Sequence, residues 1–112
     1  MTQQTDLLPP APPSEMADNA HSAATYLKTL AHEGRLMILC HLGSGEKSVG
    51  QLENLLDIRQ AAVSQMLARL REEGLVSTRR DGKTIYYSLA DDNTRQVISL
   101  LYQLFCGPQK AA

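Results

Sequence analysis

The stretch from residue 48 to residue 89 most constrains the fold of this chain. Ser48 and Gln51 have capping-box spacing and open a helix that a short break at residues 57–59 ends. A second helix then carries apolar residues at helical spacing, namely Val63, Met66, Leu67 and Leu70. Residues 75–80 and 84–89 are predicted as strands joined at Asp81-Gly82, a strong hairpin signal. Two helices followed at once by a hairpin predict a mainly α fold with a β-hairpin wing, a winged helix-turn-helix.

Helical patterns also flank this stretch on both sides. Ser14 can cap a first helix that runs to residue 31, and a second helix follows over residues 33–42. Asp91 or Asp92 caps a last helix, which the Gly107-Pro108 pair ends. We expect these outer helices to help the chain dimerise, because so small a domain has limited surface to bury on its own.

The length of 112 residues is enough for one small domain, which we place at residues 14–107. Residues 1–13 hold four of the five prolines and are predicted to form a disordered arm. Residues 108–112 form a short tail.

The sequence also favours one compartment. It contains no apolar run of 18 residues, so no membrane span is expected. Residues 1–8 lack both the basic region and the apolar core of a secretion signal. Two cysteines without such a signal fit a reducing cytosol, so we predict a cytoplasmic protein.

Positive charge is concentrated in the predicted helix-turn-helix and wing. The whole chain has a net charge of −1, but residues 59–83 carry six cations against three anions. The cations are Arg59, Arg69, Arg71, Arg79, Arg80 and Lys83. A local cationic face on an otherwise acidic chain is typical of a targeted contact with nucleic acid. On charge alone, a charged helix and hairpin that only face solvent are an equally good interpretation.

The second helix of a helix-turn-helix enters the major groove of DNA with its N-terminal residues against the base edges. The residues predicted to meet bases here are Gln60, Ala61, Ser64 and Gln65. Those predicted to meet phosphates or the minor groove are Arg69, Arg79, Arg80 and Lys83. An ordinary exposed polar face is the alternative, and the tight turn and basic hairpin around this helix favour sequence-specific binding of double-stranded DNA.

At these residues the chain resembles the winged-helix repressors of the bacterial ArsR/SmtB family. The resemblance covers roughly residues 23–105 and is most specific in "AAVSQMLARLREEGLV" and "RRDGKTIYYSL", which match the recognition helix and the wing. It implies a homodimer built from the first and last helices. It also implies binding to an inverted-repeat operator and release when an inducer binds.

The family resemblance also bears on the inducer. Metal-sensing relatives carry a Cys-x-Cys pair in the first helix of the helix-turn-helix, or Asp and His ligands along the last helix of the chain. Here residues 49–57 lack Cys and His, and no His follows His41, so no metal site and no cofactor are expected. Cys40 and Cys106 instead resemble the cysteine pair of persulfide-sensing members. That resemblance implies a response to reactive sulfur species and control of sulfide-detoxification genes. We hypothesise that these species join the two thiols by an intramolecular polysulfide link, which releases the operator and derepresses the genes.

Several alternatives stay open from the sequence. Cys40 follows Leu36 by one helical turn and could be a small buried hydrophobe, and Cys106 could lie at a frayed helix end. The chain could also be a metal-responsive repressor of the same family, or a DNA-binding protein with inert thiols. A thiol oxidoreductase or sulfur carrier is disfavoured because no CxxC motif and no acid–base cluster accompany either cysteine, so no enzyme is predicted.

Overall fold

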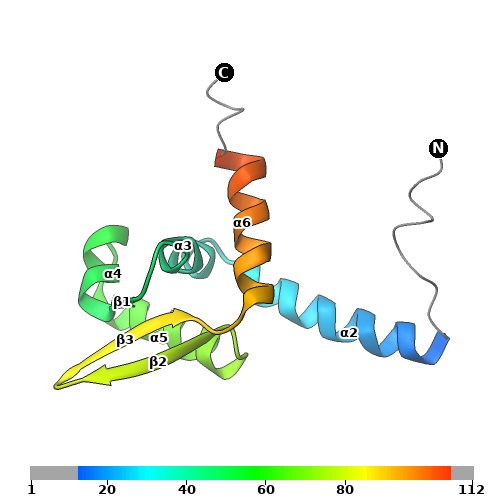
Figure 1. Ribbon diagram of the computed structural model, residues 1–112, viewed down its shortest axis with the longest axis horizontal. Coiled ribbons are helices and arrows are strands. Elements are labelled where there is room, and N and C mark those ends of the chain that lie inside the picture. Colours follow the sequence, from blue (N-terminus) through cyan, green and yellow to red (C-terminus); the bar gives the residue numbers. More distant parts are fainter. Residues whose placement is uncertain (1–12, 107–112) are drawn as a thin grey trace.

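The computed structural model describes residues 13–106. Its helices are α2 (Pro13–Leu30), α3 (Glu33–Leu42), α4 (Val49–Leu56), α5 (Gln60–Glu72) and α6 (Asp92–Cys106). Its strands are β1 (Lys47–Ser48), β2 (Val76–Asp81) and β3 (Thr84–Leu89). This is the winged helix-turn-helix predicted from the sequence. Helices α3 to α5 and the sheet form one body, from which α2 and α6 project in different directions (Figure 1).

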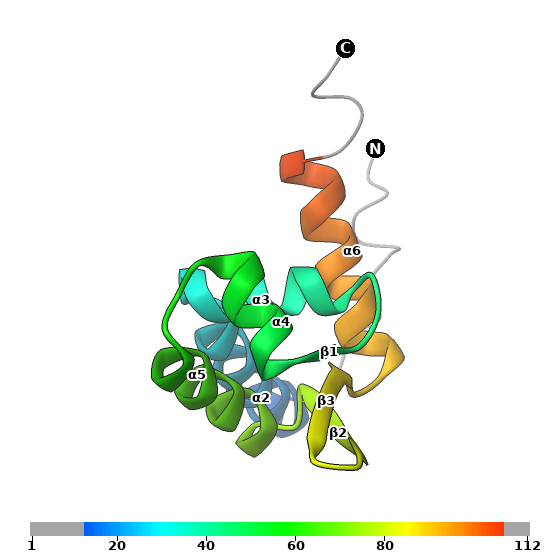
Figure 2. The same cartoon turned by 90° about the vertical axis from the view of Figure 1, so that its left-hand side faces the viewer.

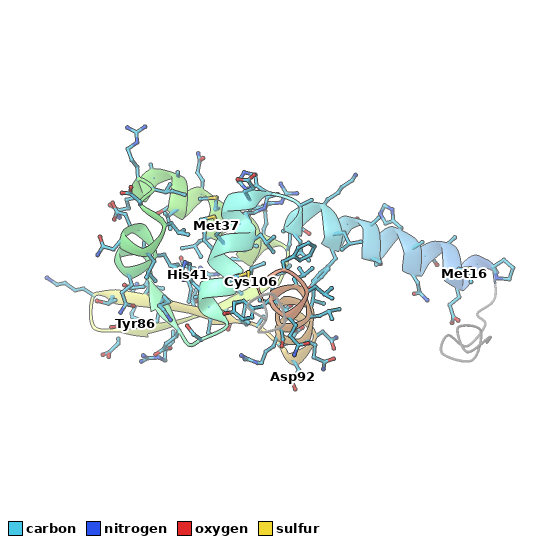
Figure 3. The ribbon with its side chains drawn as sticks, turned by 90° about the horizontal axis from the view of Figure 1, so that it is seen from above. Met16, Met37, His41, Tyr86, Asp92 and Cys106 are labelled. Atoms are coloured by element: carbon cyan, nitrogen blue, oxygen red, sulfur yellow. The ribbon has the colours of Figure 1, made fainter. Side chains whose placement is uncertain are left out.

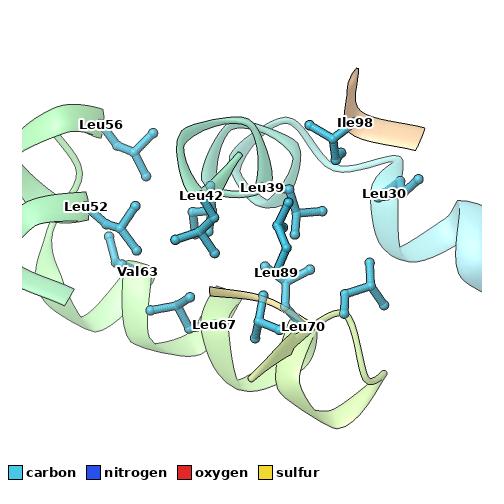
Figure 4. Packing of buried hydrophobic residues seen from close by; sticks show 13 residues of the cluster. Leu30, Leu39, Leu42, Leu52, Leu56, Val63, Leu67, Leu70, Leu89 and Ile98 are labelled. Atoms are coloured by element: carbon cyan, nitrogen blue, oxygen red, sulfur yellow. The ribbon is translucent and has the colours of Figure 1, made fainter. Parts of the chain in front are cut away.

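The core is built around α3, with α4, α5, β3 and α6 packed about it (Figure 4). Ile38, Leu39 and Leu42 of α3 are almost completely buried, and so are the apolar residues of α5: Val63, Leu67 and Leu70. Burying each such side chain stabilises the fold by about 1.5–3 kcal/mol. The 3.6-residue spacing of these positions therefore fixes which face of α5 points inward.

The ends of α4 and α5 are set by local hydrogen bonds and by backbone turns. The Ser48 side chain accepts a hydrogen bond from the Gln51 backbone, and Gln51 Oε1 accepts one from the Ser48 backbone at 2.8 Å. This capping box starts α4, and Asp57 ends it in the left-handed conformation at φ 55°. Gly74, at φ 80°, follows the end of α5 and turns the chain into the sheet.

The wing is a hairpin of β2 and β3, which pair antiparallel from Val76 opposite Leu89 to Asp81 opposite Thr84. The turn lies one residue later than expected, because Asp81 still pairs and Gly82 (φ 66°) and Lys83 form the loop. The third strand, β1, pairs with the other edge of β3 and was not predicted. Its two residues are too short to show an alternating pattern.

Helices α2 and α6 extend beyond the core (Figure 1), and Figure 2 shows α6 rising above the rest of the domain. The exposed large apolar residues on them are Met16, Leu27, Leu100, Tyr102, Leu104 and Phe105. Helix α2 begins at Pro13, and proline is favoured at the first position of a helix. Ser14, which was predicted to cap this helix, therefore lies inside its first turn. Asp91 accepts a hydrogen bond from the Thr94 backbone and caps α6 as expected.

The disordered arm predicted at residues 1–13 lies outside the described residues except for Pro13, which belongs to α2 and corrects that bound by one residue. The predicted stop at Gly107-Pro108 also lies outside the described residues. None of the helices within residues 13–106 is both long and apolar enough to cross a bilayer.

Candidate DNA-binding surface and thiol pair

Helix α5 presents a polar N-terminal face to solvent while its opposite face is fixed in the core. Gln60, Ala61, Ser64 and Gln65 are all exposed on its first turns. The three buried residues of α5 hold this face in one orientation, because rotating the helix would expose them. The arrangement can insert two glutamine amides and a serine hydroxyl into a major groove.

The cations predicted to contact DNA differ in how far they are already engaged. Arg69 pairs along α5 with Glu73 at 3.5 Å, and Arg80 and Lys83 are exposed at the distal end of the wing. Arg79 instead donates from Nε and Nη2 to the two carboxylate oxygens of Glu46, at 3.1 and 2.5 Å. Its guanidinium also lies 4.9 Å from the centre of the Tyr86 ring.

The Arg79–Glu46 pair ties the wing to the segment that leads out of α3. Their hydrogen bonds lower the pKa of the Glu46 carboxyl and raise the pKa of the Arg79 guanidinium. Arg79 belongs to β2, whereas Glu46 immediately precedes β1 on the other side of β3, so the side chain spans the sheet. Glu46 could not be predicted from the sequence, because it lies 33 positions from Arg79 and no local pattern links the two residues.

Cys40 lies near the end of α3 and Cys106 is the last residue of α6. Both are free and exposed, so Cys40 is not the small buried hydrophobe of the alternative interpretation. Partial burial raises the pKa of the Cys40 thiol, and the negative charge of Cys106 raises it further. Figure 3, viewed along the length of α6, shows Cys106 on the side of α6 toward α3.

Cys40 also opens onto a pocket between the C-terminal end of α3 and one face of α6. The pocket has a volume of about 380 Å³. Its lining residues are Cys40, Gly43, Ser44, Arg95, Ile98, Ser99 and Tyr102. Four of these follow one another at helical spacing on α6, so a single face of the helix forms one wall.

Within residues 13–106, no three His, Cys, Asp or Glu side chains gather as a metal site would require. The adjacent pair Cys40 and His41 does not change this, because neighbouring residues on a helix point about 100° apart.

Comparison with known proteins identifies the family. The family described as "Bacterial regulatory protein, arsR family" matches residues 32–78. The biofilm growth-associated repressor of Agrobacterium fabrum is 52% identical over 95 residues, which cover 85% of this chain and 81% of that protein. The chain belongs to the ArsR family. The transcriptional activator HlyU of Vibrio cholerae is 45% identical to this ArsR-family chain, over 82% of this chain and 85% of that protein.

Solved ArsR-family structures share the fold as well. Reduced HlyU from Vibrio cholerae matches with a TM-score of 0.79 at 44% identity, over 82% of this chain and 97% of that one. The repressor BigR from Xylella fastidiosa matches with a TM-score of 0.76 at 44% identity, over 86% of this chain and 98% of that one. The chain is therefore a DNA-binding transcriptional regulator of the ArsR family and not an enzyme.

Proposed function

We propose that this regulator is a homodimeric repressor that binds an inverted-repeat operator and releases it when persulfides join Cys40 to Cys106. The observation that carries the proposal is the placement of two free, exposed thiols near the C-terminal ends of α3 and α6, two helices that pack against each other. A link between them would connect the projecting helix α6 to the helix at the centre of the core. Release of the operator would then derepress genes for sulfide detoxification.

DNA binding rests on α5 and the wing. We assign base contacts to Gln60, Ala61, Ser64 and Gln65, and phosphate or minor-groove contacts to Arg69, Arg79, Arg80 and Lys83. The exposed polar face of α5 and the exposed cations of the wing support these assignments.

Dimerisation rests on the apolar faces that α2 and α6 leave uncovered. Leu104 and Phe105 are 57% and 66% exposed at the end of α6, which is costly for side chains of this size unless a partner covers them. A winged helix-turn-helix domain from Mycobacterium bovis, 28% identical with a TM-score of 0.74, is described as homodimeric. Two copies of the reader would then meet two half-sites of a palindromic operator.

The sulfur chemistry needs no oxidant other than the persulfide itself. A cysteine thiolate attacks the terminal sulfur of R–S–S–H, the S–S bond breaks, and R–S⁻ leaves and takes up a proton. The resulting cysteine persulfide accepts a second sulfur atom in the same way. The other thiolate then attacks the sulfur next to the first Sγ and expels HS⁻. Two thiols and two persulfides thus give a trisulfide link, two molecules of R–S–H and one of H₂S.

The shape of the link would discriminate persulfides from peroxides. A direct disulfide requires Cα atoms within about 7 Å of each other, whereas an additional sulfur atom extends the span. Losing a hundredfold in operator affinity requires only about 2.7 kcal/mol of coupling between the link and the reader. A few rearranged contacts per subunit would supply it.

The decisive experiment uses a duplex selected from random sequences by the reduced protein. Reduced protein treated with glutathione persulfide should gain an intramolecular Cys40–Cys106 link by intact mass and lose affinity for that duplex. The matched variants Cys40→Ser and Cys106→Ser should bind the duplex and keep it after treatment.

Failure to form the link, or normal release by Cys40→Ser, would contradict the proposal. Release by zinc, cadmium or arsenite without release by persulfide would instead assign the protein to the metal-responsive members of the family.

A further inference from the structure

The pocket beside Cys40 has the size and chemistry of a small-molecule site. Its volume of about 380 Å³ falls in the range of roughly 300–1,000 Å³ that such sites occupy. Ile98 and Tyr102 contribute apolar surface, while Ser44 and Ser99 contribute hydroxyl groups. A sulfur atom that can react therefore opens onto a cavity large enough to hold a donor molecule.

The charge of the pocket favours an anion. Of the described residues that line it, Arg95 is the only one that carries a full charge at neutral pH, and it is positive. A second cation lies next to the wall, because Lys47 Nζ donates a hydrogen bond to Ser44 Oγ at 3.2 Å. The two cations come from different elements, Arg95 from α6 and Lys47 from β1.

Arg95 is not strongly engaged by its acidic neighbour. Its Nε lies 3.8 Å from Asp92 Oδ1, which is too long for a hydrogen bond, and both side chains are largely exposed. Such a pair within one helix contributes little, so a carboxylate that enters the pocket can replace Asp92. An incoming carboxylate would form charge-assisted hydrogen bonds with the planar guanidinium.

We propose that this pocket docks the sulfur donor, that Arg95 selects organic persulfides bearing a carboxylate, and that Cys40 receives the first sulfur atom. The proposal rests on the persulfide-sensing function proposed above. The Cys40 thiolate attacks the terminal sulfur of the docked R–S–S–H, the S–S bond breaks, and R–S⁻ leaves and takes a proton from water. Cys106 does not line the pocket and acts afterwards, when the link closes.

A matched pair of donors tests the charge preference. N-acetylcysteine persulfide and N-acetylcysteine amide persulfide differ only in a carboxylate that the amide replaces. With Cys106→Ser, which retains one thiol, we expect sulfur addition measured by intact mass to be about tenfold faster with the acid, the factor that one charge-assisted contact supplies. Arg95→Gln in the same background should remove the preference.

Two further variants control for structure and position. Arg95→Lys keeps the charge and should keep most of the preference, whereas Arg71→Gln removes an exposed arginine of α5 and should not change it. In Cys40→Ser, sulfur addition to Cys106 should show no preference between the donors.

Equal rates with both donors, or a preference that survives Arg95→Gln, would overturn this proposal and leave persulfide sensing intact. A preference at Cys106 that depends on Arg95 would overturn the assignment of Cys40 as the first acceptor. If neither donor adds sulfur to either cysteine, both this proposal and the proposed function fail.

Discussion

Helices α5 and α6 are both amphipathic, yet the core holds them in different ways. Helix α5 buries Val63, Leu67 and Leu70, which span most of its length. Helix α6 buries Thr94 and Ile98 in its first half, and its second half extends away from the body. The reading surface is therefore positioned within one subunit, whereas the end of α6 that carries Cys106 depends on contacts made elsewhere.

The largest expected effect contrasts these two helices directly. Leu67→Ala should lower the free energy of unfolding by about 2–5 kcal/mol, because it leaves a cavity in the core. Leu104→Ala should leave the subunit folded by circular dichroism and weaken self-association in sedimentation equilibrium. A similar loss of subunit stability in both variants would show that the end of α6 is held as firmly as α5.

A smaller effect is expected where α5 meets DNA. Gln65→Ala should cost about 1–3 kcal/mol of discrimination between the selected duplex and a scrambled one, because a bidentate base contact is lost. The exposed Gln96 of α6 provides the matched control, and Gln96→Ala should leave both affinities unchanged. Equal weakening on the two duplexes would remove Gln65 from the base contacts.

The wing should show a difference between two adjacent arginines. Arg80→Gln should reduce the slope of log affinity against log salt by about one unit, because one phosphate contact is lost. Arg79→Gln should change the slope less, since Glu46 already neutralises that guanidinium. Equal slope changes, measured by fluorescence anisotropy across salt concentrations, would show that DNA displaces Glu46.

The smallest expected effect concerns the pKa of the Cys40 thiol near the end of α3. Burial and the charge of Cys106 both raise the pKa of the Cys40 thiol, so its thiolate is scarce at neutral pH and becomes more abundant as pH rises. Alkylation of Cys40 should therefore accelerate with pH and reach half its maximum above the pH typical of a free cysteine. Cys106→Ser should lower that midpoint without returning it fully, because the burial remains. An unchanged midpoint would show that the charge of Cys106 does not influence the pKa of the Cys40 thiol.

The sequence was sufficient for the elements whose signals are local. The capping box at Ser48 and the apolar spacing of α5 each depend on neighbours within a few residues, and both predictions were confirmed. The strands of the wing were predicted to within one residue at their ends. Local chemistry was enough because each signal acts within a single turn or hairpin.

The features that sequence analysis missed arise from packing between distant segments. Strand β1 pairs with the edge of β3 that β2 leaves free, and Glu46 meets Arg79 across the same sheet. The pocket beside Cys40 requires α3 and α6 to lie together, which no spacing in the sequence specifies. The roles of the DNA-contacting residues and of the two thiols remain predictions for the experiments above.

The bond between Arg79 and Glu46 also constrains the length of the chain between α3 and β1. Surface loops usually tolerate added residues, because their backbone faces solvent and no contact fixes their length. Here Glu46 is bonded to Arg79 and the next residue, Lys47, pairs with Tyr87 in the sheet. The length of the loop at residues 43–46 therefore sets the distance from the cysteine-bearing helix α3 to the wing. A single residue inserted there should shift the tilt of the wing while the core of the domain stays intact.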